Sequence, residues 1–121
     1  MSFRPVDESF SSINYELENV LKILQEKTIE LAVSRENYLK AKIFAEKEYS
    51  RFLLESKAKN PDMVQSEIKA QAKVLSYDSK LESVKFQSSY MKIFNELKVL
   101  RDQLDMLYEH SYNLRSETRL K

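Results

Sequence analysis

The first half of the chain repeats apolar residues at intervals of seven. Steps of seven from Phe10 to Phe52 meet only apolar or aromatic residues, as expected for a helix whose apolar seam faces another helix. A second series begins at Ile13 but includes polar residues such as Lys27. The pattern predicts one continuous helix over about residues 8–59, with a seam that thins toward its end. Its predicted core leucines are Leu17, Leu24 and Leu31.

A proline then interrupts the helical pattern. Pro61 disfavours helix at Asn60 and suits the first turn of a new helix, so we place the turn at about residues 60–65. A second helix is predicted over about residues 66–115, because apolar residues recur there at alternating steps of four and three. The predicted core residues of its seam are Phe86, Ile93, Leu97, Leu100, Leu104 and Leu107.

Four apolar residues at the start of this helix follow a different register. They join the later seam only after a shift of phase near residue 85. Such a discontinuity is typical of a local change of supercoil or of partner. The four residues are Val74, Tyr77, Leu81 and Val84.

Two helices of similar length joined by a short turn are expected to form an antiparallel hairpin. More apolar residues lie off the seam than one hairpin can cover, and burial by other copies is the simplest solution. We therefore predict an all-α fold: a long antiparallel helical hairpin with coiled-coil character, one domain over residues 1–121, assembling into a homo-oligomer.

The composition narrows the possible activities. The chain has no glycine, no cysteine, two prolines and one histidine, His110. The lack of glycine argues against folds of many short strands and against glycine-rich phosphate loops. Disulfides, cysteine nucleophiles and the usual zinc sites need residues that the chain lacks. We expect no catalytic residue, no metal, no cofactor and no enzymatic activity.

No apolar run exceeds three residues, whereas a membrane span needs about eighteen. The first residues turn acidic where a secretory signal would turn apolar. We expect a cytoplasmic protein without membrane contact.

Positive charge is concentrated in the middle of the chain. Residues 37–59 hold six lysines and arginines against three glutamates. One face of the predicted helix there combines cations with an aromatic ring, which suits phosphates and a base of single-stranded nucleic acid. The alternative is an ordinary solvated face, because glutamates are interleaved with the cations. The residues of this face are Lys40, Phe44, Lys47 and Arg51.

Further lysines surround the predicted turn, among them Lys57 and Lys59. This end of the hairpin would be more positive than the other and could attract a nucleic acid or an acidic protein surface. In a homo-oligomer, repeated copies would join such basic patches into a continuous band.

Residues 39–44 read Leu-Lys-Ala-Lys-Ile-Phe, and a polar turn leads to Ser-Glu-Ile-Lys at residues 66–69 and to the stretch from Val74 to Leu81 in the second helix. These segments resemble UvsY, the recombination mediator family of tailed phages. The resemblance covers roughly residues 20–114. It departs from the family at residues 56–62, which replace a glycine-containing polar loop.

The resemblance implies a homo-oligomer that binds single-stranded DNA, helps displace single-strand-binding protein and loads a RecA-like recombinase. It places the DNA-binding basic pair on Lys40 and Lys42. A phage-encoded protein of this kind would act in the host cytoplasm.

Other classes share the same periodicity. A helical-hairpin export chaperone or stalk protein of the FliJ type would bind protein and no nucleic acid. A structural subunit of a virion would likewise lack DNA affinity, and its assembly would not depend on Lys40 or Lys42. Binding to single-stranded DNA, and its dependence on salt, separates these classes from a recombination mediator.

Overall fold

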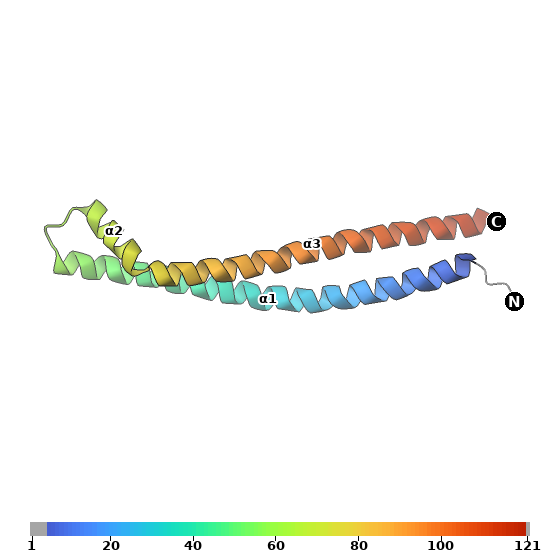
Figure 1. Cartoon of the computed structure of the whole chain (residues 1–121), viewed down its shortest axis with the longest axis horizontal. Helices are drawn as coiled ribbons and strands as arrows, with labels where there is room; N and C mark the ends of the chain where they lie inside the picture. The colour runs from blue at the N-terminus through green and yellow to red at the C-terminus, as the bar shows by residue number, and fades with distance from the viewer. Residues whose placement is uncertain (1–4, 121) are drawn as a thin grey trace. The chain divides into compact units, whose positions relative to one another are not determined.

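The computed structural model describes the backbone of residues 5–120 and the side chains of residues 11–117. It contains three helices, α1 (Pro5–Lys59), α2 (Gln65–Leu75) and α3 (Tyr77–Leu120), and no strand within this range (Figure 1). The predicted all-α class is confirmed, and so is the hairpin of two long helices. Helix α1 begins at Pro5, earlier than expected, because proline suits a first helical position. Phe10, the first residue of the apolar series, lies outside the described side chains.

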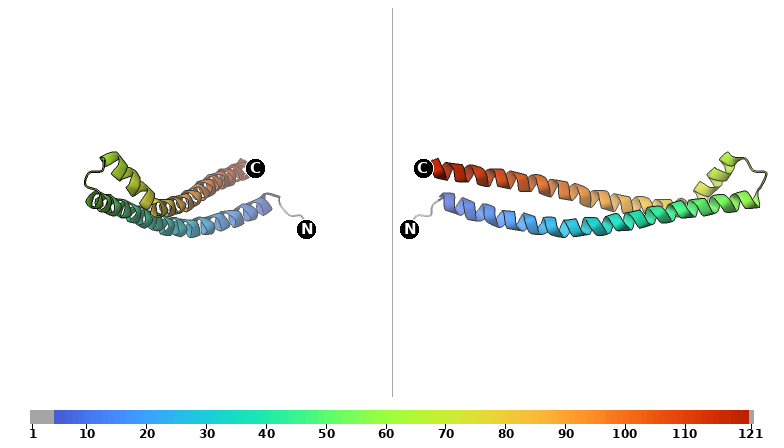
Figure 2. Two further views of the ribbon diagram at one scale, coloured as in Figure 1. Left: turned by 60° about the vertical axis from the view of Figure 1, so that its left-hand side comes forward. Right: turned by 180° about the vertical axis from the view of Figure 1, so that it is seen from behind.

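The chain divides into two units. The first, here the terminal unit, comprises Met1–Glu30 and Ile93–Lys121, and the second, the turn unit, comprises Leu31–Lys92. Helices α1 and α3 contribute a segment to both units. Within each unit the two segments lie side by side and run antiparallel, as the views in Figure 2 also show.

The terminal unit has a narrow apolar core. Ile13 and Val20 of α1 are buried, and Leu97 of α3 is only 2% exposed. Lys27 occupies a seam position further along α1, where its Nζ lies 2.8 Å from a carboxylate oxygen of Glu96 on α3. An ion pair therefore takes the place of an apolar contact at that level. The remaining predicted core residues of this unit are half-buried: Leu17, Leu24, Ile93, Leu100, Leu104 and Leu107.

In the turn unit the seam combines aromatic and small residues. The rings of Tyr38 and Tyr90 stack across the helices with centroids 6.1 Å apart. Further toward the turn, α1 presents Ala41 and the buried Ala45. Leu31 and Phe86 are half-buried.

At the N-terminal end of α3, and at the residue just before it, serines occupy the positions of the seam. Ser76 and Ser83 are 5% and 7% exposed, and Ser79 between them is half-buried. Together with Phe86 and Tyr90 they keep the steps of three and four, so the seam does not change phase near residue 85. Small side chains on both helices allow close packing here. The four apolar residues expected to join the seam through such a shift are exposed instead: Val74, Tyr77, Leu81 and Val84.

The predicted second helix of residues 66–115 is divided at Ser76. The Ser76 hydroxyl donates a hydrogen bond of 2.7 Å to the Ala72 carbonyl, which also accepts the Ser76 backbone N–H at 3.0 Å. A serine hydroxyl that bonds back to the preceding turn bends a helix. Helix α2 consequently leaves the direction of α3 (Figure 2) and buries Ile68 and Ala72.

Candidate nucleic-acid interface

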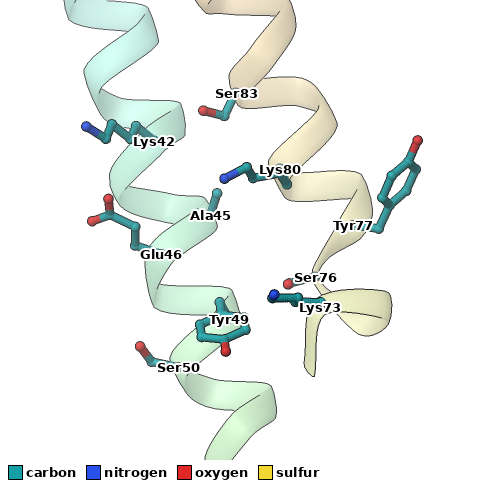
Figure 3. Close-up of a pocket in the computed structure, with 10 residues that line it drawn as sticks. All are labelled: Lys42, Ala45, Glu46, Tyr49, Ser50, Lys73, Ser76, Tyr77, Lys80 and Ser83. Carbon is teal, nitrogen blue, oxygen red and sulfur yellow. The ribbon is translucent and has the colours of Figure 1, made fainter. Parts of the chain in front are cut away.

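A groove of about 740 Å³ lies in the turn unit, where α1 passes the junction of α2 and α3 (Figure 3). Its lining combines three lysines with two tyrosines and three serines, against a single carboxylate. We call it the basic groove. Its residues are Lys42, Ala45, Glu46, Tyr49, Ser50, Lys73, Ser76, Tyr77, Lys80 and Ser83.

Helical spacing and the break at Ser76 bring these residues together. Lys42 and Tyr49 are seven residues apart and therefore share one side of α1. Lys73 lies in the last turn of α2, and Lys80 lies in the first turn of α3. Because α2 bends away at Ser76, the groove is bounded by three helical segments rather than by two.

The cations of the basic groove are not held in ion pairs, although Glu46 also lines the groove. Lys42, Lys73 and Lys80 form no ion pair with any residue whose side chain the structure describes. In Figure 3, Lys73 and Lys80 extend toward α1, whereas Lys42 extends away from α3. The three ammonium groups therefore do not converge on one point. Such a distribution suits an extended polyanion better than a single small anion.

Two of the cations predicted from the sequence are already paired within α1. Lys40 lies 3.0 Å from Glu36. Arg51 lies 2.7 Å from Glu48 and 3.1 Å from Glu55, and it stacks over a neighbouring ring. The hydrogen bond that Arg51 donates to Glu48, followed by the charges of both carboxylates, raises the pKa of Arg51. A phosphate would have to compete with these glutamates.

The other predicted residues lie apart from the basic groove, except for Lys42. Phe44 is 55% exposed and borders another groove, of about 300 Å³, together with Lys40 and Phe86. Lys40 and Lys42 lie on opposite sides of the seam residue Ala41, so the predicted basic pair is divided between the two grooves. The remaining three, Lys47, Lys57 and Lys59, are exposed on α1.

Of the residues that line the basic groove, only Lys42 was predicted from the sequence as a site residue. The aromatic and cationic residues that the prediction missed are Tyr49, Lys73, Tyr77 and Lys80. The heptad spacing from Lys42 to Tyr49 could have indicated the first. Tyr77 and Lys80 reach the groove only because the helix is divided at Ser76, and no punctuation in the sequence marks that break.

Two other kinds of site, a metal centre and a membrane span, are not formed by the described residues. No group of three potential metal ligands occurs among them, and His110 is exposed on α3. None of the described helices has an apolar stretch able to cross a bilayer. Comparison of the chain with protein-family models, curated proteins and solved structures finds no match.

Proposed function

We propose that the protein is a non-enzymatic accessory protein that binds single-stranded DNA along the basic groove. The observation that carries the proposal is the set of three lysines that line one groove together with the ring of Tyr49 and have no ion-pair partner among the described side chains. Lysines neutralise phosphates without reading sequence, and aromatic rings stack on unpaired bases. Duplex DNA keeps its bases stacked, so the rings favour a single strand.

The role in recombination rests on the resemblance to UvsY over residues 20–114. Within that proposal, homo-oligomeric copies hold the strand, single-strand-binding protein is displaced, and a RecA-like recombinase is loaded. A negative result with a recombinase would remove this role and leave the binding of single strands in place.

The test is a salt titration of binding to labelled single-stranded DNA, followed by fluorescence anisotropy. We expect the double variant Lys42→Ala/Lys80→Ala to bind more weakly to strands of any sequence. Loss of two phosphate contacts per chain should flatten the slope of log affinity against log salt by roughly 1.4, at about 0.7 per phosphate.

The matched control is Lys40→Ala/Lys47→Ala, which removes the same charge from the other side of α1. Lys40 is paired with Glu36, so this variant should change the slope much less. Equal losses in both variants would mean that general charge, not the groove, attracts DNA. Absence of binding by the wild type at low salt would refute the proposal.

A protein-binding hairpin, of the FliJ type or in a virion, is the second candidate. It is favoured by large exposed apolar side chains on both long helices, such as Ile43, Leu54 and Val99. A partner captured through these residues without any affinity for DNA would support it.

A further inference from the structure

Helix α3 carries a second apolar stripe on its outer side. Tyr77, Leu81, Val84 and Met91 follow one another at the steps of a coiled-coil seam, with Ser88 filling the remaining position. They are 60%, 38%, 44% and 44% exposed. The inner side of the same turns presents serines instead. The larger apolar side chains therefore face solvent where the helix pair itself needs only small ones, which indicates an external helix as partner.

We propose that this outer stripe binds the same stripe of a second copy of the chain, with the two α3 helices antiparallel. A twofold axis between residues 82 and 83 would place Leu81 against Val84 of the second copy, and the reverse. Such an interface is isologous, so a single stripe must complement itself. This proposal does not depend on DNA binding.

The charges beside the stripe support an antiparallel second copy. Asp78 and Lys85 flank the stripe on one side, seven residues apart, and neither has an ion-pair partner among the described side chains. In the proposed arrangement each Asp78 comes beside Lys85 of the other copy, so the pair forms twice. The other side of the stripe opposes Lys80 to Gln87, which is uncharged.

A parallel arrangement of the same stripes is disfavoured by charge. In a parallel pair of helices, the residue just before a seam position on one helix faces the residue just after a seam position on the other helix. Lys80 would then meet Lys85 of the second copy on both sides of the interface. Only the antiparallel arrangement turns the flanking charges into attractive pairs.

The test is sedimentation velocity of the full chain without nucleic acid, with helicity checked by circular dichroism. We expect the wild type to form dimers or multiples of dimers at micromolar concentration, and Leu81→Asp to dissociate them while remaining helical. Val99→Asp adds the same charge at another exposed position of α3 and should leave this association intact.

Charge reversal tests the orientation. Asp78→Lys and Lys85→Asp should each weaken the dimer about tenfold, because two attractive pairs become repulsive. The double variant Asp78→Lys/Lys85→Asp should restore wild-type affinity within about threefold. A wild type that stays monomeric, an assembly that resists Leu81→Asp, or a double variant as weak as the single ones would each overturn the proposal. None of these outcomes bears on whether the basic groove binds DNA.

Discussion

Lys27 shows how one polar residue can fix the alignment of two apolar helices. It occupies a seam position of α1 and pairs with Glu96 across the seam and with Glu30 one turn further along α1. A charged residue in a seam is best accommodated in the register that supplies its partner. The hydrogen bond that Lys27 donates to Glu96, followed by the one that it donates to Glu30, raises the pKa of Lys27 above its ordinary value.

The raised pKa gives this pair a defined dependence on pH. Because the folded state holds the proton more tightly than the unfolded chain, the pair stabilises the fold at neutral pH. That contribution is lost as the pH rises past the ordinary lysine pKa of about 10.4. Glu96→Gln should therefore lower the melting temperature at pH 7 to 9, and its difference from the wild type should shrink above that pKa. A difference that stays constant with pH would show that Glu96 acts through packing alone.

Leu97 is the most completely buried large side chain described, whereas the other predicted core leucines are half-buried. Leu97→Ala should reduce the free energy of unfolding by about 2–5 kcal/mol, because it removes buried methyl groups and leaves a cavity. Chemical denaturation measures this loss. Val99→Ala, at a position 65% exposed, serves as the control and should stay within about 0.5 kcal/mol of the wild type.

At the scale of the elements, the heptad pattern predicted most of the architecture. The apolar repeat of α1 and the proline at the turn were sufficient for two long helices and a reversal near residue 60. The division at Ser76 was not predictable in this way, because the surrounding sequence is compatible with a continuous helix. It depends on a hydroxyl that bonds to the carbonyl of Ala72, and serine has many other hydrogen-bonding options.

The inner and outer sides of α3 were only partly predictable for a related reason. Apolar spacing passes over serines, so it indicated a shift of phase near residue 85, with a change of supercoil or of partner as the alternatives. In the structure Tyr77, Leu81 and Val84 are exposed and the serines continue the seam. The alanines in the seam of α1 could have indicated that the serines of α3 face them, because small residues on one helix pack closely against small residues on the other. The phase shift expected near residue 85 reflects the outer stripe, whose apolar residues do not belong to the seam.

The candidate site was less predictable than the fold, because spacing alone does not show which cations are paired. Glu36, Glu48 and Glu55 lie three or four residues from the cations that they neutralise, so those pairs could have been anticipated. The unpaired cations of the basic groove come from three helical segments, and their proximity depends on tertiary structure.

At the scale of the whole molecule, the two proposals make a joint prediction. Tyr77 belongs to the outer stripe and Lys80 flanks it, and both residues also line the basic groove. In the antiparallel dimer, the side of the outer stripe that carries Lys80 lies on the same face in both copies. The two basic grooves would therefore face the same way, and the two Lys80 side chains would lie near the twofold axis. A DNA strand that crosses both grooves would neutralise the mutual repulsion of the two Lys80 side chains and would occupy two binding sites at once.

Linked sites bind a long strand more tightly than a short one, because the second site is engaged at a high local concentration. Leu81→Asp, which should leave single grooves intact, is therefore expected to weaken binding to an oligonucleotide of about thirty bases at least tenfold. Binding to about six bases, too short to span two grooves, should change little. Anisotropy titrations with both lengths measure the ratio, with Val99→Asp as the matched control. If Leu81→Asp weakens both lengths equally, the substitution disturbs the groove itself; if it weakens neither while abolishing the dimer, each chain holds its strand independently.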